Sequence, residues 1–271
     1  MDPDTIQLQV LIAPVCDIVK QAGREIMKIY LAGFEVKEKE DHSPLTTADL
    51  AAHRLICDQL RALTPGIPIL SEESASIPYT QRSKWVSYWL IDPLDGTREF
   101  IKRNGEFTVN IALIINHVAH LGVVYIPVQD ICYFAATGFG AFKQEQDRAA
   151  YRIRTRPSAP GETPTICGSR SHAGNSLLAL LARIGEHEMI RIGSSIKTCL
   201  VAEGTADLYP RFGPTSEWDT AAAHCVVHEA GGSLVDTQLR PLRYNTKDSL
   251  LNPSFMVLGN LNDQWREVLL C

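Results

Sequence analysis

The stretch WLIDPLDGT, residues 89–97, joins an apolar run to two aspartates that stand three residues apart. We expect a buried strand up to Asp92, because Pro93 has no amide hydrogen with which to continue a ladder. The end of that strand would point the carboxylates of Asp92 and Asp95 and the carbonyl of Leu94 at one small volume. Hard cations such as Mg2+ prefer an all-oxygen set of this kind. The stretch therefore predicts a metal site at a strand end.

The turn after this strand also predicts contacts with an anion. Gly96 permits a tight turn, and exposed backbone amides of Gly96 and Thr97 can face a phosphate. The alternative is an aspartate-rich turn with no ligand, because Asp-Gly is a common turn dipeptide.

Three other acidic segments carry candidate ligands. Glu72 and Glu73 follow the apolar stretch 67–70, where they would supply a metal ligand and a group that orients water. Asp49 and Asp219 stand in the first turns of expected helices, and the small residues after Asp219 would let its helix approach another element closely. The alternatives are a solvated acidic pair for the glutamates and helix-capping carboxylates for the aspartates.

Hydrophobic periodicity divides the chain into an α+β half and an α/β half. In the first half we expect helices over 4–31 and 48–63, then strands over 89–92, 107–115, 121–126, 131–136, 141–143 and 151–155 that form an antiparallel meander. Pro14 is expected to kink or interrupt the first helix, and Thr47 to cap the second.

A linker rich in proline, RPSAPGETP at 156–164, predicts a boundary between domains 1–157 and 158–271. Beyond it we expect strands over 165–168, 188–192, 206–209, 233–235 and 255–258. Helices over 174–184, 194–203 and 218–230 alternate with them, and a further helix closes the chain. Alternating strands and helices indicate a layered α/β arrangement.

Composition restricts the class of protein. The 271 residues are 45% hydrophobic and carry a net charge of -5, which excludes wholesale disorder and argues against nonspecific binding to nucleic acid polymers. Seven scattered cysteines without a CxxC pair are typical of reduced thiols in a cytoplasmic protein. The acidic N-terminus and short apolar runs lead us to expect neither a secretory signal nor a transmembrane segment.

A competing metal hypothesis rests on histidines. His224 and His228 stand four residues apart on the expected 218–230 helix, a spacing that can bind zinc. Packed or capping histidines are the alternative, because the order is not HExxH and no third ligand is evident. The sequence has no GxSxG, P-loop or GxGxxG motif. It therefore lacks the motifs that would indicate a nucleophilic hydrolase, a kinase or a dinucleotide-binding protein.

Taken together, these motifs resemble a known superfamily. WLIDPLDGTREFIK at 89–102 and WDTAAAHCVVHEAGG at 218–232 resemble the two signatures of the inositol monophosphatase superfamily, and LSEE and TTAD precede them in the expected order. Further stretches resemble its bacterial CysQ-type branch of 3′(2′),5′-bisphosphate nucleotidases. They are EFIKRNGEFTVNIAL at 99–113, SRSH at 169–172, GSSIK at 193–197 and LVAEGTADLYPRFGP at 200–214.

The resemblance implies a layered α/β/α/β/α sandwich of the inositol monophosphatase and fructose-1,6-bisphosphatase type, with its site in a cleft between two parts. It implies hydrolysis of the 3′-phosphate of 3′-phosphoadenosine 5′-phosphate to AMP and phosphate, in sulfur assimilation or recycling of that nucleotide. Two or three Mg2+ ions would be required, and lithium would inhibit. The family also implies a small-molecule nucleotide bisphosphate as the partner, a monomer or homodimer, and a cytoplasmic location with peripheral attachment to the inner membrane.

The same resemblance assigns residues. It places metal ligands at Glu72, Asp92, the Leu94 carbonyl, Asp95 and Asp219, and gives Asp49, Thr97 and Glu72 catalytic roles around the attacking water. The substrate-binding residues that it implies are Leu94, Asp95, Gly96, Thr97, Ser169, His172, Gly193, Ser194, Lys197, Arg211 and Asp219. GSSIKTC departs from close relatives at Ile196 and Thr198, in the wall of the nucleotide pocket.

Two other functions remain open at this point. An inositol or sugar monophosphatase would not need Lys197 and Arg211, because a second phosphate requires basic partners that a monophosphate does not. Lys197, with the amides of a helix that starts after Gly193, would meet that second phosphate. A noncatalytic nucleotide-binding sensor would not need the complete ligand set and Asp49.

Overall fold

The computed structural model describes residues 7–33, 36–38, 44–157, 162–170 and 174–260. Its larger sheet has seven strands in the order β3-β4-β5-β6-β7-β8-β9. Their bounds are β3 Ile69–Ser71, β4 Ser87–Asp95, β5 Thr108–Ile115, β6 Val118–Ile126, β7 Ile131–Ala136, β8 Gly140–Glu145 and β9 Tyr151–Ile153. Strands β4 to β9 pair antiparallel with their neighbours, which confirms the predicted meander. Strand β3 pairs parallel with β4 at the edge.

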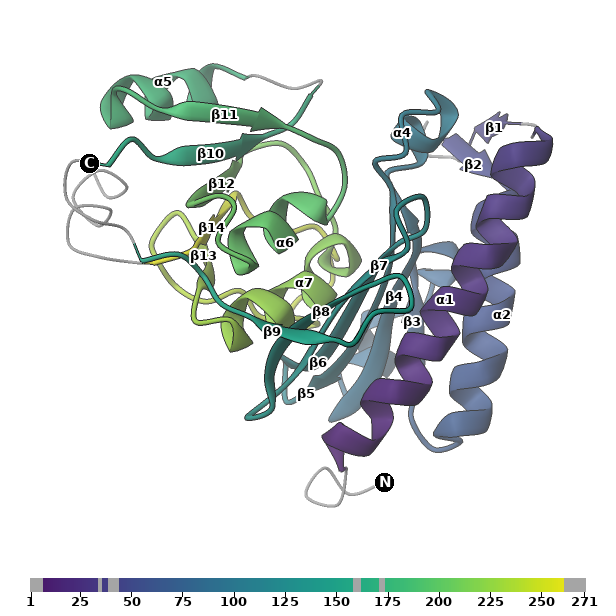
Figure 1. Cartoon of the computed structure of the whole chain (residues 1–271). Coiled ribbons are helices and arrows are strands. Elements are labelled where there is room, and N and C mark those ends of the chain that lie inside the picture. The colour runs from purple at the N-terminus through teal and green to yellow at the C-terminus, as the bar shows by residue number, and fades with distance from the viewer. Residues whose placement is uncertain (1–6, 34–35, 39–43, 158–161, 171–173, 261–271) are drawn as a thin grey trace.

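Helices cover both faces of this sheet (Figure 1). Helices α1 (Leu8–Ala32) and α2 (Thr47–Leu63) pack side by side on one face through a large apolar cluster. Helices α6 (Ile196–Ala202) and α7 (Glu217–Glu229) lie on the other face. A Cβ atom on Gly122 of β6 would come 2.1 Å from the carbonyl oxygen of Ala222, so the expected close approach of the alanine-rich helix is confirmed.

The second sheet has five strands in the order β11-β10-β12-β14-β13. Their bounds are β10 Thr165–Gly168, β11 Glu188–Arg191, β12 Leu208–Arg211, β13 Ser233–Asp236 and β14 Phe255–Leu258. Helix α5 (Asn175–Ile184) lies on its outer side, and α6 and α7 lie between the two sheets (Figure 1). The layers are therefore helices, sheet, helices, sheet and helix, which confirms the α/β/α/β/α expectation.

The predicted domain boundary falls between the two sheets. All seven strands of one sheet precede residue 154, and all five strands of the other follow residue 164. One apolar cluster nevertheless contains residues of both halves, such as Leu90 and Tyr133 with Val226 and Leu234. The division at 157 stays a prediction. Of the linker, residues 158–161 lie outside the described residues, as does the expected closing helix after residue 260.

Several local expectations were wrong. Helix α1 is not interrupted at Pro14, where the missing amide hydrogen removes one hydrogen bond, to the carbonyl of Val10, and the expected kink there stays a prediction. The cap of α2 is Thr46 rather than Thr47, because Thr46 Oγ1 accepts the Ala48 amide at 3.2 Å. Short elements had too few residues for a periodic signal. These are β1 Val36–Glu38, β2 Pro44–Thr46, the 3-10 turn Glu72–Ser74, α3 Tyr79–Arg82 and α4 Thr97–Ile101.

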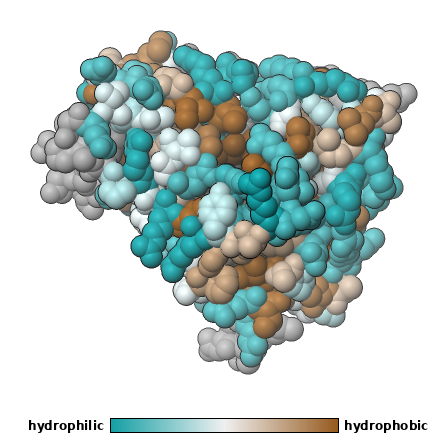
Figure 2. Space-filling view, in the orientation of Figure 1, coloured by the Kyte–Doolittle hydropathy of each residue, from teal (hydrophilic) through white to brown (hydrophobic). Residues whose placement is uncertain are grey.

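The described surface gives no sign of a membrane span. No helix among the described residues is long and apolar enough to cross a bilayer. On the face in Figure 2, hydrophobic side chains lie in several areas that hydrophilic side chains separate.

Candidate active site

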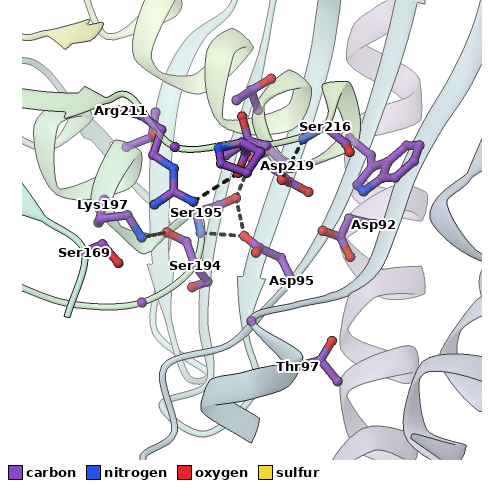
Figure 3. A pocket seen from close by; sticks show the side chains of 18 of the residues that line it. Asp92, Asp95, Thr97, Ser169, Ser194, Ser195, Lys197, Arg211, Ser216 and Asp219 are labelled. Carbon is purple, nitrogen blue, oxygen red and sulfur yellow. Dashed lines mark hydrogen bonds between the residues drawn. The ribbon is translucent and has the colours of Figure 1, made fainter. Parts of the chain in front are cut away.

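A cleft of about 460 Å³ brings together almost all of the predicted site residues. They come from the end of β4, the 3-10 turn after β3, the start of α4, the 193–198 segment, the end of β12 and the start of α7 (Figure 3). The lining includes Glu72, Asp92, Leu94, Asp95, Gly96, Thr97, Ser169, Gly193, Ser194, Lys197, Arg211 and Asp219. His172 lies outside the described residues.

Strand β4 places its two aspartates by means of a β-bulge. Asp92 pairs with Asn110, and Asp95 pairs with Thr108. Between these two pairs, β4 contains one residue more than β5, which is the mark of a β-bulge. The strand was expected to end at Asp92, but it continues through Pro93 because a bulge needs no amide donor there. The bulge turns both aspartates toward the same cleft.

Three carboxylates lie close enough to share a cation. One oxygen each from Asp92, Asp95 and Asp219 can be chosen so that all lie within 4.8 Å of one another. Burial raises the pKa of Asp92 well above its usual range, and the charges of Glu72, Asp95 and Asp219 raise it further. Burial and the charge of Asp95 also raise the pKa of Asp219. Three carboxyl groups are therefore crowded into one small volume, although the charge of Arg211 acts on the pKa of Asp219 in the opposite direction.

The turn after β4 depends on glycine. Gly96 has φ +94°, and a Cβ atom there would come 3.0 Å from the carbonyl oxygen of Glu106. Thr97 then begins α4, with its hydroxyl 3.3 Å from both Asp49 Oδ1 and the Leu94 carbonyl oxygen. A hydroxyl has one proton, so Thr97 donates to one of these oxygens at a time.

Asp49 combines the capping role with a place in the site. Its Oδ2 accepts the Thr46 amide at 2.8 Å and the Thr46 hydroxyl at 2.6 Å, which forms a capping box. Its Oδ1 faces Thr97, and the carboxylate is completely buried. Asp219 repeats this arrangement, because its Oδ2 accepts the Ser216 amide at 2.9 Å in a capping box at the start of α7. The capping interpretation is thus correct for both aspartates and leaves each an oxygen for other contacts.

Basic groups line the opposite wall of the cleft. Lys197 is 5% exposed, donates from Nζ to the Ser194 carbonyl oxygen at 2.6 Å and lies over the Tyr209 ring at 5.1 Å. Burial lowers the pKa of Lys197 to about 8, with a further contribution from Arg211. Arg211 donates from Nη2 to the Pro214 carbonyl oxygen, and its buried Nε has no hydrogen-bond partner among the described residues.

The helix expected after Gly193 begins at Ile196 and has Lys197 in its first turn. Two of the backbone amides before it already have partners, and the contact with a second phosphate stays a prediction. The Gly193 amide donates to Glu106 Oε2 at 2.9 Å, and the Ser195 amide donates to Asp95 Oδ2 at 2.6 Å. Gly193 instead allows a close approach, since a Cβ atom there would come 2.8 Å from the Glu99 side chain.

Sequence reasoning missed several residues of the cleft. Ser195, Tyr209, Ser216 and Trp218 line it, and so does Arg98, whose side chain is exposed. All but Ser216 lie inside the quoted motif stretches, and Ser216 lies three positions before Asp219, so membership of a motif was the available signal.

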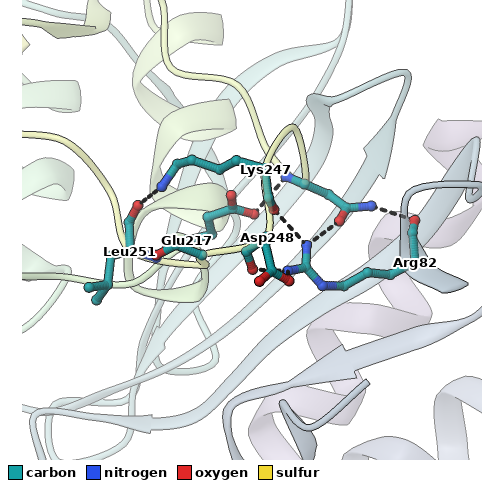
Figure 4. A network of polar contacts seen from close by, with 7 residues as sticks. Arg82, Glu217, Lys247, Asp248 and Leu251 are labelled. Carbon is teal, nitrogen blue, oxygen red and sulfur yellow. Dashed lines mark hydrogen bonds and ion pairs between the residues drawn. The ribbon is translucent and has the colours of Figure 1, made fainter. Parts of the chain in front are cut away.

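Behind the cleft, a buried polar network holds the start of α7 (Figure 4). Arg82 is buried and donates to the Asn245 side chain and to the carbonyl oxygens of Lys247 and Asp248. The Asn245 amide donates to Glu217 Oε2 at 2.7 Å. Burial raises the pKa of Glu217 to about 7. The network connects the loop around Asn245 to the helix that carries Asp219.

The structure does not assemble a zinc site around His224 and His228 among the described residues. His224 is buried, and its Nδ1 lies 2.8 Å from the Tyr244 hydroxyl. Burial lowers the pKa of His224 to about 3, while His228 is exposed. Among the described residues, the group that could hold a metal is the aspartate trio.

Comparison with known proteins agrees with this geometry. The model of the inositol monophosphatase family matches residues 7–268. The chain belongs to the inositol monophosphatase family. Members of this family are metal-dependent phosphatases. The carboxylate trio fits such a metal, because three acidic side chains within 4.8 Å are costly without a cation between them.

Within the family, the chain is similar to proteins named CysQ. The 3′(2′),5′-bisphosphate nucleotidase CysQ of Escherichia coli (strain K12) is 51% identical over 245 residues, which cover 90% of this chain and 97% of that protein. The protein of the same name from Salmonella typhimurium (strain LT2) is 49% identical over 249 residues, or 91% of this chain and 99% of that protein. The crystal structure of CysQ from Bacteroides thetaiotaomicron is 41% identical, with a TM-score of 0.82 over 94% of this chain and 99% of that chain.

Proposed function

We propose that this protein hydrolyses the 3′-phosphate of 3′-phosphoadenosine 5′-phosphate to AMP and phosphate. One observation carries the proposal: a single cleft holds an acidic cluster on one wall and two basic side chains, Lys197 and Arg211, on the other. The Nε of Arg211, which has no hydrogen-bond partner in the part of the chain that the structure describes, is a donor that a second phosphate would satisfy. The relatives named 3′(2′),5′-bisphosphate nucleotidase support the same substrate class.

The acidic wall is the proposed place for Mg2+, as two or three ions. The ligands would be Glu72, Asp92, the Leu94 carbonyl, Asp95 and Asp219. Bound Mg2+ would supply positive charge that offsets the charge of the phosphate and of the leaving oxygen. Hydrolysis of phosphate monoesters is so slow in water that charge neutralisation of this kind has to provide much of the acceleration.

Asp49 and Thr97 are the proposed acceptors for the proton of the attacking water. Thr97 lines the cleft and Asp49 lies behind it, 3.3 Å from the Thr97 hydroxyl. When Thr97 donates to Asp49, its oxygen keeps lone pairs that accept a hydrogen bond from water. The water proton can then pass to Thr97 as the Thr97 proton passes to Asp49, while the water oxygen attacks phosphorus and the bond to the 3′-oxygen breaks. The 3′-oxygen leaves with the bonding electron pair and takes a proton from solvent water, which gives the 3′-hydroxyl of AMP. Glu72 would orient the water from the other side.

The basic wall is the proposed place for the 5′-phosphate. With a pKa of about 8, most of the Lys197 side chains are charged at neutral pH. Ser169, Gly193 and Ser194 line the same part of the cleft and would contact the nucleotide with His172. A charged lysine and a guanidinium donor beside a nucleotide select a substrate with two phosphates over one with a single phosphate.

Rates of phosphate release test this proposal against its alternatives. The purified protein is given 3′-phosphoadenosine 5′-phosphate, AMP or inositol 1-phosphate, each with and without Mg2+. We expect release from the bisphosphate with Mg2+ at a kcat/KM well above that for the two monophosphates. Preference for inositol 1-phosphate would indicate the monophosphatase, and nucleotide binding without release would indicate the sensor.

A further inference from the structure

Ser195 lies where the acidic and basic walls of the cleft meet. It follows Gly193 and Ser194, is 4% exposed, and lies beside Asp95 and Asp219 (Figure 3). Its Oγ is 2.7 Å from Asp95 Oδ2 and 2.8 Å from the carbonyl oxygen of Asp219. The Asn110 side-chain amide donates to the same Oγ at 2.9 Å.

The donors around Asp95 all gather on one of its oxygens. The Ser195 amide and hydroxyl lie 2.6 and 2.7 Å from Oδ2, and the side chains of Thr108 and Asn110 lie 3.4 and 3.5 Å from it. Because Oδ2 is already surrounded by donors, Oδ1 is the oxygen left for a cation in the cleft. The contacts therefore fix the rotation of the Asp95 carboxylate as well as its position.

Ser195 also connects Asp95 to the helix that carries Asp219. Its hydroxyl has one proton, and Asn110 already donates to its oxygen, so the proton goes either to Asp95 or to the Asp219 carbonyl. Both acceptors belong to residues of the carboxylate trio. One buried hydroxyl thus lies between two members of the trio that stand far apart in the sequence and donates to one of them at a time.

We propose that the Ser195 hydroxyl is a positioning group for metal binding, which acts through Asp95 and Asp219 and does not contact the substrate. This inference rests on the proposed function, because it assumes that the trio holds Mg2+. Groups that orient metal ligands from outside the coordination shell commonly change metal affinity by about 10- to 100-fold when they are removed. Without the hydroxyl, Asp95 can rotate and the first turn of α7 loses a tether, so the preformed site becomes looser.

Direct metal binding tests the inference without any substrate. Mg2+ affinity is measured by isothermal titration calorimetry on the full-length protein, on Ser195→Ala, and on Ser87→Ala. Ser87 is a matched control because it is a buried serine at the opposite end of β4 from Asp95. We expect Ser195→Ala to weaken Mg2+ binding about 10-fold or more, and Ser87→Ala to leave it within about twofold.

Two further measurements separate positioning from other roles. Ser195→Thr keeps a hydroxyl and should recover Mg2+ affinity, and Ser195→Cys, with a weaker donor, should lie between the wild-type protein and the alanine variant. At saturating Mg2+, KM of Ser195→Ala for the bisphosphate should remain close to the wild-type value. Unchanged Mg2+ affinity with a lower apo melting temperature would mean that Ser195 only packs, and a raised KM at saturating Mg2+ would make it a substrate contact. Either result overturns the inference. Wild-type hydrolysis, assayed separately, reports on the proposed function alone.

Discussion

Lys197→Met tests whether the basic wall of the cleft recognises a second phosphate. Methionine keeps an unbranched apolar stem against the Tyr209 ring but removes the ammonium group. The lost contact is a hydrogen bond between charged groups, worth about 1.5–3 kcal/mol. This corresponds to a loss of about one to two decades in kcat/KM for the bisphosphate. Hydrolysis of a monophosphate should change by much less, because it has no group to place there.

The pH dependence gives an independent measure of the same contact. The pKa of Lys197 in the free protein is lowered to about 8, so roughly nine-tenths of it is charged at pH 7 and roughly a tenth at pH 9. Since kcat/KM reports the ionisation of the free enzyme, its value for the bisphosphate should fall from pH 7 to pH 9 in the wild-type protein. The kcat/KM of Lys197→Met for the bisphosphate should not show this fall between pH 7 and pH 9.

Steady-state phosphate release at saturating Mg2+ measures both effects, with bisphosphate and monophosphate substrates in parallel. Lys84→Met is the control for a lost surface charge, because Lys84 is exposed and does not line the cleft. The folded state should be as stable as the wild type or more so, since a buried ammonium without a carboxylate partner is costly. Equal losses on both substrates would refute the reasoning and place Lys197 in the general catalytic site.

Three other perturbations address the acidic wall and the stability of the fold. Asp92→Asn and Asp95→Asn should each lower kcat/KM by about 100-fold or more. The melting temperature of the metal-free protein should stay equal or rise, because each change relieves repulsion within the trio. A variant that unfolds or keeps its turnover contradicts the ligand assignment. Lithium should slow turnover when Mg2+ is in excess, and sodium at equal ionic strength should not. Asp219→Glu should shift the lithium sensitivity and the Mg2+ dependence of turnover together. If lithium and sodium act alike, the assignment of Asp219 as a ligand in a lithium-sensitive metal site fails. His224 has a pKa of about 3 in the folded protein against 6.5 in the unfolded chain. Below pH 6.5 the unfolded chain therefore binds the extra proton, and stability falls by about 2 kcal/mol from pH 7 to pH 5. Urea unfolding of His224→Gln should show that much less pH dependence, and an unchanged dependence would exclude His224 as its source.

Sequence predicts well those parts of the site whose residue types and spacing are informative over a short stretch of chain. An Asp-Gly pair after an apolar run marked the end of β4, although Pro93 did not end the strand, and acidic residues in first turns marked Asp49 and Asp219. The capping and functional interpretations of these aspartates looked like rivals in the sequence. They are compatible because a carboxylate has two oxygens, of which the capping box uses one.

The parts that sequence does not predict depend on contacts between distant segments. The bond between the Ser195 amide and Asp95 joins residues that stand 100 positions apart, and the Arg82–Asn245 contact joins residues 163 positions apart. Neither leaves a periodic or spacing signal in the chain. The engagement of the Gly193 amide by Glu106 has the same origin, because these residues stand 87 positions apart.

Product analysis in 18O-labelled water tests the central claim most directly. The wild-type protein is incubated with 3′-phosphoadenosine 5′-phosphate and Mg2+, and 31P NMR and mass spectrometry identify where the phosphate is lost and where the label goes. Attack of water on the 3′-phosphorus predicts AMP with an unlabelled 5′-phosphate and inorganic phosphate that carries one 18O. Adenosine 3′-phosphate as the product, label in the nucleotide, or no hydrolysis with Mg2+ present would contradict the account.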